Sequence, residues 1–356
     1  MKRLILVVLA LAAQGAWSAQ STPPTGWSAD GSRIIVAGNL SDGKGIYILD
    51  SEGRKHEYIP FEHEVLAVKW PNVDGPMCLL ARHPDGRYYL WSANSTGIID
   101  RVSERSVYVG RLPSAGLFDC SPDGRYVVFA SGTGAEIDLW RADTERTPDK
   151  QLTNSGGRDF GPAWSPDGRR IAFSSERGGT AGIWVMPAGG GPAKRLVDGP
   201  GQELDPSWSP KGNDLLYLVK GKGEGIYACS ASGGSSRPIA VGGRDYAAPV
   251  WSHTGKWISF VYGSNPANLF CTPADKAKGY GPYYQTSFDR SAGLKVETRA
   301  SAWSPSRDQL VFATYETGKM TVRLANISPG YGAVPRDIYM DPGIFGAGKI
   351  NTGTDR

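Results

Sequence analysis

The sequence has 356 residues, with 39 Lys or Arg against 35 Asp or Glu, and a formal net charge of +4. The charged residues are scattered between turns and form no basic run, which excludes nucleic acid and an anionic membrane surface as expected partners. The chain is rich in turn residues, with 47 Gly and 25 Pro, and its length alone permits one or two domains.

The pattern of residues 1–18 predicts a secretory signal peptide. Lys2 and Arg3 precede an apolar run over residues 4–13, and small residues place the expected cleavage after Ser18 or Ala19. The alternative, a retained membrane anchor, needs a longer apolar run. No later stretch approaches a spanning length, so no stable membrane insertion is expected. The sequence therefore predicts a periplasmic or secreted protein.

Seven similar units follow in chain order. Each begins at a tryptophan, replaced once by cysteine, that leads into a turn such as Ser-Pro-Asp-Gly. In such turns Pro fixes φ at the first central position, and Gly suits a positive φ. These anchor residues, separated by 43 to 52 positions, are Trp27, Trp70, Cys120, Trp164, Trp208, Trp251 and Trp303.

Short runs of alternating polarity, rich in β-branched and aromatic residues, predict four strands in each unit. An extra piece, residues 105–113, separates units two and three. The strands expected in the first two units are residues 26–27, 33–37, 45–50, 55–59, 65–70, 77–81, 88–92 and 97–102. Those expected in the last unit are residues 309–314, 321–326 and 336–340.

Repetition at this period, with four strands in each unit, predicts an all-β fold, a single β-propeller of four-stranded antiparallel blades. A lone meander leaves both faces wet, whereas radial stacking buries them, and the tryptophans are expected to fill the gaps between blades. Seven anchors predict seven blades. Six is the alternative, because a competing His-Pro-Asp-Gly turn at His83 follows the irregular turn after Trp70. The expected domains are a signal peptide over residues 1–18, a propeller over residues 19–342 and a flexible tail over residues 343–356.

The unit at Trp164 reads Pro-Ala-Trp-Ser-Pro-Asp-Gly-Arg-Arg-Ile-Ala-Phe-Ser-Ser, followed by Ile-Trp-Val-Met and Lys-Arg-Leu. This pattern resembles the TolB-type propeller repeat, which occurs in periplasmic TolB and in the propellers of dipeptidyl peptidases and tricorn-like proteases. The resemblance covers nearly all of the chain after the signal peptide. It implies a propeller and, by analogy with TolB, a role in binding other proteins. No counterpart is expected of the α/β domain that precedes the propeller in TolB-like proteins, so a Tol-specific role does not follow.

Four cysteines, Cys78, Cys120, Cys229 and Cys271, fall in four different units. An exported protein meets an oxidising compartment, where an even number of cysteines favours bridges. The spacing between strands of neighbouring blades, however, usually exceeds what a disulfide spans. Buried free thiols are therefore expected, with a bridge between Cys78 and Cys120 as the alternative.

The connections from the outer strand of one unit to the inner strand of the next are expected to open around the channel mouth. Charged residues with adjacent aromatic residues repeat in them, and such a surface suits a peptide segment or a sugar. The alternative is structural, with the Asp residues bonded to their own loops and the Arg residues paired with them. The candidate binding residues here are Arg158, Asp159, Glu203, Arg244, Asp245 and Tyr246.

A tyrosine-rich insertion over residues 276–296 is not required by the blade geometry. Long loops on rigid scaffolds commonly carry binding, and Tyr offers a large contact area with few rotatable bonds. Tyr280, Tyr283 and Tyr284 are therefore further candidate binding residues. The alternative is a flap over the side of the propeller.

No catalytic motif is evident in the sequence. A Gly-x-Ser-x-Gly elbow is absent, and the four histidines are too dispersed for a metal-ligand spacing, so no cofactor or metal is expected. The leading hypothesis is a periplasmic or secreted TolB-like scaffold that binds a protein or peptide and catalyses nothing. One alternative is a carbohydrate-active lyase or glycosidase that uses Asp159, Glu203 and Asp245 at the channel mouth. Another is a sugar-binding module.

Overall fold

The computed structural model describes residues 25–40, 43–71, 75–94, 97, 99–109, 116–144, 148–243, 245–263, 268–275, 284–285, 301–316, 319–327 and 334–340. The predicted signal peptide (residues 1–18) and tail (residues 343–356) lie outside this part of the chain. Within it, all regular structure is β, and the strands form seven four-stranded sheets. The described residues contain no helix that is long and apolar enough to span a bilayer.

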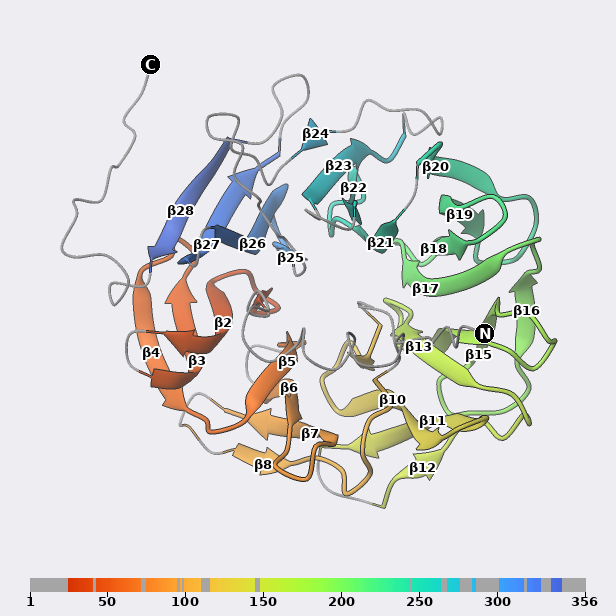
Figure 1. The fold of residues 1–356 in the computed structure, drawn as a ribbon, viewed down its shortest axis with the longest axis horizontal. Coiled ribbons are helices and arrows are strands. Elements are labelled where there is room, and N and C mark those ends of the chain that lie inside the picture. The colour runs from red at the N-terminus through yellow and green to blue at the C-terminus, as the bar shows by residue number, and fades with distance from the viewer. Residues whose placement is uncertain are drawn as a thin grey trace, which may run out of the picture.

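The seven sheets surround a common centre as the blades of a propeller, and the first strand of each blade lies innermost (Figure 1). Blade 1 consists of β1 (Thr25–Trp27), β2 (Arg33–Leu40), β3 (Gly43–Asp50) and β4 (Lys55–Pro60). Blade 2 consists of β5 (Glu64–Lys69), β6 (Met77–Arg82), β7 (Tyr88–Ala93) and β8 (Ile99–Arg101). Blade 3 consists of β9 (Phe118–Cys120), β10 (Tyr126–Thr133), β11 (Glu136–Asp143) and β12 (Lys150–Gln151).

The remaining four blades repeat this order of strands. Blade 4 consists of β13 (Asp159–Trp164), β14 (Arg170–Ser175), β15 (Gly182–Pro187) and β16 (Lys194–Val197). Blade 5 consists of β17 (Gln202–Trp208), β18 (Asp214–Lys220), β19 (Gly225–Ser230) and β20 (Arg237–Val241). Blade 6 consists of β21 (Tyr246–Trp251), β22 (Trp257–Tyr262), β23 (Asn268–Pro273) and β24 (Tyr284–Gln285). Blade 7 consists of β25 (Ser301–Trp303), β26 (Gln309–Glu316), β27 (Lys319–Asn326) and β28 (Val334–Met340).

The predicted all-β propeller with seven blades is confirmed, and the six-blade alternative is wrong. The doubtful second unit is a complete sheet, in the order β5-β6-β7-β8. The competing turn at His83 does not start a blade. It joins β6 to β7, with the Gly86 amide donating to the His83 carbonyl at 2.9 Å.

The seven anchor residues are buried between blades. The six tryptophans are only 3% to 7% exposed, and Cys120 is 7% exposed. Each of the seven apolar clusters in the described part of the chain lies mainly between one pair of neighbouring blades and contains one anchor. Trp208, for example, packs with Ile183 of blade 4 and Leu215 of its own blade. The clusters therefore supply a continuous core around the ring.

In the described residues, the ring is closed without a strand shared between its first and last blades. In the described strands, the sheets of blades 1 and 7 each consist of four consecutive strands, and neither borrows a strand from the other. Trp27 packs with Val311 and Leu324 of blade 7, and its indole N–H donates to the Ala302 carbonyl at 3.2 Å. Apolar packing and this hydrogen bond thus hold the first blade to the last.

The Ser-Pro-Asp-Gly turns have the local structure that their residue types predict. The Gly168 amide donates to the Ser165 carbonyl at 2.9 Å, and Gly168 has a φ of +70°. The Asp167 carboxylate accepts the Arg169 amide at 3.0 Å and the Ser165 hydroxyl. The Ser165 hydroxyl in turn accepts the Arg170 amide at 2.9 Å. These bonds fix the hairpin between β13 and β14, so the anchor directly before it is held in place.

A bulge recurs in the inner strands of blades 4, 5 and 6. The register shifts two to four residues before each anchor tryptophan, where a proline follows a residue with positive φ. The residues with positive φ are Gly161 (+63°), Asp205 (+52°) and Ala248 (+48°). Because Pro supplies no N–H to the ladder, an interruption of pairing at this position is expected. The bulges therefore mark the same point on three successive inner strands.

All four cysteines are buried, and none is bonded to another in this structure. Cys78 and Cys120 belong to one apolar cluster between blades 2 and 3. Cys229 lies in the cluster between blades 4 and 5, and Cys271 in the cluster between blades 6 and 7.

Candidate functional site

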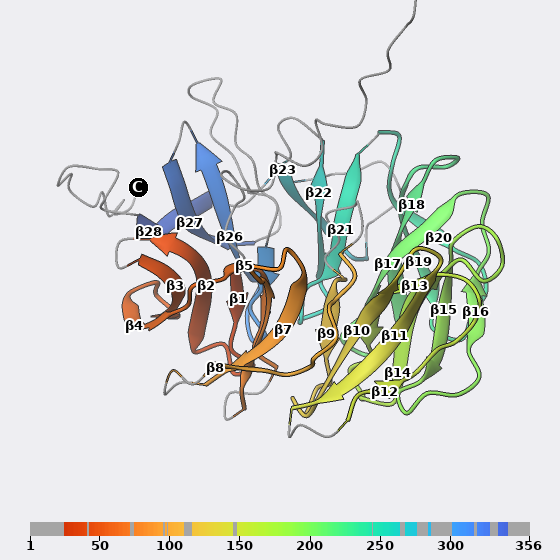
Figure 2. The ribbon, with the colours of Figure 1, turned by 60° about the horizontal axis from the view of Figure 1, so that its bottom comes forward.

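Two kinds of connection open at the same end of the propeller. One kind runs from the outer strand of a blade to the inner strand of the next, and the other is the hairpin between the second and third strands. They meet directly, since the Glu176 amide donates to the Arg158 carbonyl at 2.9 Å and the Glu203 amide to the Ala181 carbonyl at 3.0 Å. We call this end the channel face. The strands run between the two ends of the ring, so the Ser-Pro-Asp-Gly turns lie at the opposite end (Figure 2).

Arg158 and Asp159 reach two residues of one neighbouring hairpin. The Arg158 guanidinium binds both carboxylate oxygens of Glu176, with an Nε to Oε2 distance of 2.7 Å. This contact raises the pKa of Arg158. Asp159 is fully buried and binds Arg177 at 2.8 Å. The two predicted charges are thus held in separate ion pairs within blade 4.

The Asp159 carboxylate is only partly satisfied. Its Oδ2 accepts hydrogen bonds from the Ser155 hydroxyl at 3.1 Å and from Arg177 at 2.8 Å. Its Oδ1 is buried and has no hydrogen-bond partner among the described residues. Arg177 is fixed from another side by the Trp184 ring, 4.7 Å from its guanidinium carbon. A buried carboxylate with a spare acceptor therefore lies at the start of β13.

Glu203 occupies the position in blade 5 that Asp159 occupies in blade 4, five residues before the anchor tryptophan. It is 1% exposed, and a Cβ on Gly199 would lie 2.5 Å from its Oε1. Burial raises the pKa of Glu203, against the opposing effect of the Gly199 and Gly201 backbone N–H groups. The carboxyl group is thus turned back onto its own loop.

Asp245 is exposed at the channel face and has a φ of +62°. Its amide donates to the Glu224 carboxylate at 2.8 Å, and the same carboxylate binds Lys220 at 3.0 Å. This chain of contacts ties the hairpin of blade 5 to the entry of blade 6. Arg244, the remaining candidate in this connection, lies outside the described residues.

The aromatic side chain exposed near Asp245 is Tyr262. Tyr246 is only 3% exposed, and its ring packs 6.0 Å from Phe260 and 5.0 Å from Tyr262. Tyr262 is 37% exposed, and a Cβ on Gly243 would lie 2.6 Å from its ring. The sequence analysis missed Tyr262, although it ends a strand that leads to the channel face.

The tyrosine-rich insertion is described only in part. Tyr280 and Tyr283 lie outside the described residues. Tyr284 lies in β24, where its backbone pairs with Cys271. The candidate site is therefore built from blades 4, 5 and 6 without these tyrosines.

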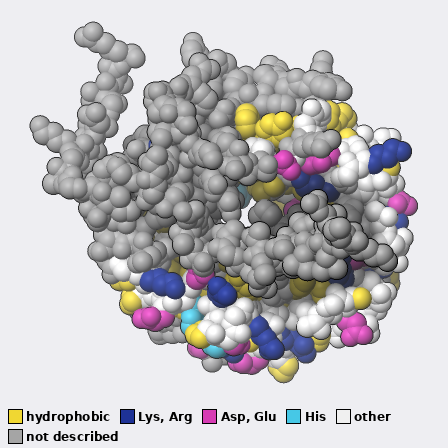
Figure 3. Space-filling view, viewed as in Figure 1, with side chains coloured by type: hydrophobic (Ala, Val, Ile, Leu, Met, Phe, Trp, Pro, Cys, Tyr) yellow, Lys and Arg dark blue, Asp and Glu magenta, His cyan; other side chains and the backbone are white. Residues whose placement is uncertain are grey.

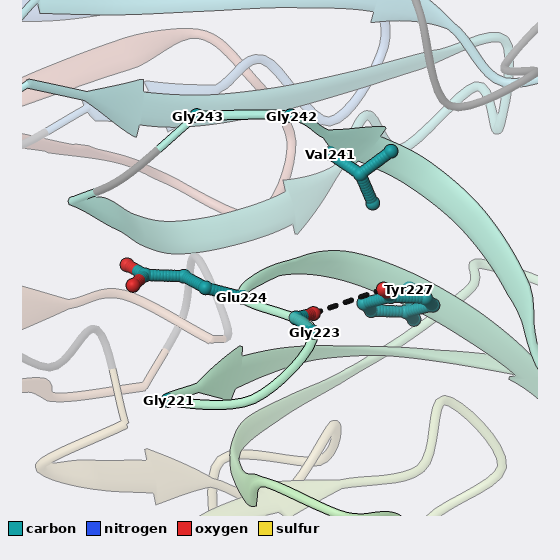
Figure 4. A pocket seen from close by; sticks show the side chains of 7 residues that line it. All are labelled: Gly221, Gly223, Glu224, Tyr227, Val241, Gly242 and Gly243. Atoms are coloured by element: carbon teal, nitrogen blue, oxygen red, sulfur yellow. Dashed lines mark hydrogen bonds between the residues drawn. The ribbon is translucent and has the colours of Figure 1, made fainter.

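An open cavity of about 620 Å³ lies at the channel face between the two connections that Asp245 joins (Figure 4). Four of its seven lining residues are glycines, so much of its wall is backbone. The Tyr227 hydroxyl donates to the Gly223 carbonyl at 2.9 Å and fixes one edge. The lining residues are Gly221, Gly223, Glu224, Tyr227, Val241, Gly242 and Gly243.

Acidic and basic side chains lie next to each other beside the opening near the middle of the ring (Figure 3). Ion pairs between oppositely charged side chains also occur in the connections of blades 4 and 5. Lys220 pairs with Glu224, and Arg195 pairs with Asp198 at 2.7 Å. Among the candidate residues, Arg158 and Asp159 are likewise held in local ion pairs, as the structural alternative expects.

Two histidines that the sequence analysis treated as dispersed lie together in blade 2. The ring centroids of His63 and His83 are 5.4 Å apart, and His63 packs 5.0 Å from Trp91. Burial, followed by the nearby His83, lowers the pKa of His63. One histidine enters β5 and the other leaves β6, so knowledge of which connections share a face would have predicted their proximity. Among the described residues, no group of three or more His, Cys, Asp or Glu side chains is placed to hold a metal ion.

Residues 119–278 match the family model of the TolB beta propeller domain. Comparison of the sequence with curated proteins finds no match. The matched residues run from the inner strand of blade 3 to beyond β23 of blade 6, and they include the site above. The predicted TolB-type repeat is therefore confirmed over these residues.

Solved structures share the fold at low sequence identity. TolB from Acinetobacter baumannii is 19% identical, with a TM-score of 0.53 over 68% of this chain and 61% of that chain. This chain thus spans less than two thirds of that TolB. An oligogalacturonate lyase in complex with manganese is 14% identical, with a TM-score of 0.64 over 86% of this chain and 89% of the lyase. A puromycin hydrolase is 16% identical, with a TM-score of 0.62 over 90% of this chain and 53% of the hydrolase. At these identities the comparisons establish the fold alone.

Proposed function

We propose that this TolB-like propeller is a non-catalytic scaffold that binds an extended segment of another protein, or a peptide, at the channel face of blades 4 to 6. The observation that carries the proposal is the glycine-lined cavity. Four of its seven lining residues are glycines, so a partner backbone can approach closely there and be recognised through main-chain contacts. Recognition of this kind tolerates many partner sequences.

Fixed charges and one exposed ring surround the cavity. The Lys220, Glu224 and Asp245 contacts hold two connections in one arrangement before any partner arrives. Tyr262 adds an exposed ring next to Gly243. Preorganised loops lower the entropic cost of binding, and Tyr is favoured in contact surfaces. These features support binding and require no catalytic group.

We also propose that the protein is exported to the periplasm or secreted, with residues 1–18 removed as a signal peptide. The basic start and the short apolar run support this. Residues 19–342 then form the propeller and residues 343–356 a tail. Determination of the N-terminal residue of the exported protein tests the proposal, and an intact Met1 would contradict it.

Two exposed lysines at opposite ends of blade 5 give a matched test of the binding face. Lys222 lies in the hairpin beside the cavity, and Lys211 lies in the turn at the other end. A partner is first identified by co-purification, and its affinity is then measured for Lys222→Glu and Lys211→Glu. The proposal expects at least about a tenfold loss for Lys222→Glu and no change for Lys211→Glu. Equal effects of the two variants would refute it.

A second candidate function is a carbohydrate-active lyase. The observation that favours it is the alignment of an oligogalacturonate lyase with this chain over most of both proteins. Asp159, Glu203 and Asp245 are the residues nominated for it. Turnover of oligogalacturonate, assayed with and without added manganese, tests this directly. Turnover that Asp159→Ala abolishes would overturn the scaffold proposal.

A further inference from the structure

Two cysteines from neighbouring blades meet in one buried cluster. Cys78 lies in β6 of blade 2 and is 0% exposed, and Cys120 ends β9 of blade 3 and is 7% exposed. Both contribute to the same apolar cluster. A hydrogen bond with Cys78, together with burial, raises the pKa of the Cys120 thiol. The two sulfur atoms are therefore neighbours across the interface between blades.

A bond between charged side chains fixes the same pair of strands. Lys69 is the cross-strand partner of Cys78, and its ammonium group binds the carboxylate of Asp119, the residue before Cys120. The second oxygen of Asp119 accepts the Trp164 amide at 2.7 Å. Blades 2, 3 and 4 are thus tied together around the two thiols. This arrangement limits the relative movement of the strands that carry them.

We propose that Cys78 and Cys120 are an oxidation site that closes as a disulfide between blades 2 and 3 when a small-molecule disulfide such as glutathione disulfide is present. One cysteine thiolate attacks the glutathione disulfide, forms a mixed disulfide and releases one glutathione thiolate. The second cysteine thiolate then attacks the sulfur of the first and releases the other glutathione. The protein loses two electrons and two protons, and one glutathione disulfide becomes two glutathione molecules.

The bond forms during folding and slowly afterwards. The thiolate is the attacking species, so the raised pKa of Cys120 disfavours attack in the native state. Burial also keeps glutathione from both sulfur atoms. In a chain that is still folding, both thiols are accessible. A bond made then also restrains the unfolded chain between residues 78 and 120, which stabilises the folded protein.

The other two cysteines are an internal control. Cys229 lies between blades 4 and 5, and Cys271 lies between blades 6 and 7. They are 3% and 0% exposed, so their burial matches that of the first pair. They differ in having no second cysteine in their clusters. If a disulfide forms between Cys78 and Cys120 alone, the reason is therefore their proximity and not a difference in burial.

The experiment refolds the reduced full chain in a mixture of glutathione and glutathione disulfide. Free thiols are then alkylated under denaturing conditions, and the digest is analysed by mass spectrometry. The proposal expects a Cys78–Cys120 linked peptide, with Cys229 and Cys271 alkylated. Four alkylated cysteines, or bonds that involve Cys229 or Cys271 equally often, would overturn it.

A second measurement separates a native bond from an accidental one. The oxidised protein should unfold at a higher temperature than the reduced protein, and this difference should vanish in Cys120→Ser. If the protein with the Cys78–Cys120 disulfide unfolds at the same or a lower temperature than the reduced protein, the disulfide is not compatible with the folded propeller and the proposal is wrong.

Discussion

The environment of each indole N–H distinguishes the anchor tryptophans. Trp208 and Trp251 are both 7% exposed and fill equivalent gaps between blades. The Trp208 N–H donates to the Ala163 carbonyl at 3.0 Å. The Trp251 N–H is buried and has no partner among the described residues. The same side chain is therefore satisfied in one blade and unsatisfied in the next.

Replacement by phenylalanine should separate these two cases. Trp208→Phe loses packing and a hydrogen bond, whereas Trp251→Phe loses packing and an unpaired donor. We expect Trp208→Phe to lower the free energy of unfolding by about 1 to 2 kcal/mol more than Trp251→Phe. Urea denaturation of both variants measures the difference. Equal losses would show that the two N–H groups contribute alike.

Glu203 should make stability depend on pH in a direction opposite to most carboxylates. Burial raises its folded-state pKa. Its contribution to stability is therefore fully present below the unfolded pKa and is lost as the pH rises through the folded pKa. We expect Glu203→Gln to gain stability relative to the original protein on going from about pH 5 to about pH 8. Urea denaturation at the two pH values checks this.

Asp167 is the control of opposite sign. Its pKa is lowered by hydrogen bonds from the Ser165 hydroxyl and the Arg169 amide. Its contribution is present above the unfolded pKa and is lost as the pH falls through the folded pKa. Asp167→Asn should therefore be less stable than the original protein near neutral pH, with the difference shrinking in acid. If both variants followed the same trend, local burial and bonding would not explain the shifts.

At the scale of single residues, the sequence predicted which connections carry charged and aromatic residues, but not the partners or the burial of those side chains. Arg158 and Asp159 were candidates because they precede an inner strand. Their partners Glu176 and Arg177 lie in a hairpin whose position depends on how a whole blade folds back. Tyr246 and Tyr262 show the same limit, because only packing decides which ring is buried.

At the scale of elements, the bulge in the inner strands sets a test of backbone strain. Gly161 and Ala248 occupy the same position and have φ values of +63° and +48°. A Cβ on Gly161 would meet its nearest neighbours at 3.5 Å, so space is available. The difference between the two residues therefore lies in the backbone conformation, which disfavours alanine.

We expect the substitutions Gly161→Ala and Ala248→Gly to have opposite effects on the free energy of unfolding. Gly161→Ala should lower the free energy of unfolding by about 1 kcal/mol, and Ala248→Gly should leave it unchanged or raise it. Thermal or urea denaturation measures both. A loss of similar size in both variants would place the cost in side-chain contacts and not in φ.

Most strands were predictable because turn residues mark their ends. Gly168 and Asp167 have the φ value and hydrogen bonds that Ser-Pro-Asp-Gly predicts. Blade 2 was the doubtful case, since the turn after Trp70 is irregular and a better one follows at His83. Strand pairing resolved it: Met77 pairs with Ala93 through the hairpin at His83. A turn motif predicts a reversal of the chain, but not which pair of strands it joins.

At the scale of the whole molecule, the junction of blades 1 and 7 differs from the others. Blades 4 and 5 are joined by the short connection at residues 198–201 as well as by Trp208. Blades 1 and 7 are neighbours in space but opposite ends of the ring in sequence. Trp27 and its cluster hold them together. The loss of one tryptophan should therefore have different consequences at the two junctions.

Trp27→Ala and Trp208→Ala test this difference. Each removes a tryptophan that is 7% exposed, so each should lower the free energy of unfolding by about 3 to 5 kcal/mol. In native-state hydrogen exchange, only Trp27→Ala should increase local exchange in the inner strands β1 and β25. A similar local increase in β13 and β17 for Trp208→Ala would contradict the expectation.

The blade count was predictable from the repeat, since each anchor residue fills one gap between blades. The mode of ring closure was not, because a repeat does not show whether the last sheet takes a strand from the first. The location of the cavity was equally hidden. It depends on two glycine-containing connections, at Gly223 and Gly242, that come together only when blade 5 is complete.

Blades 1 and 7 are not linked by a chain connection in the described residues, so their junction is a seam in the ring. Separation there leaves the four described strands of each sheet paired, and it breaks side-chain packing and the bond from the Trp27 indole to the Ala302 carbonyl. The central channel could therefore widen by small rotations of blades 1 and 7 away from each other, while each blade keeps its own strand pairing. A polypeptide could enter such a channel from the side, through the parted blades, without being threaded from an end.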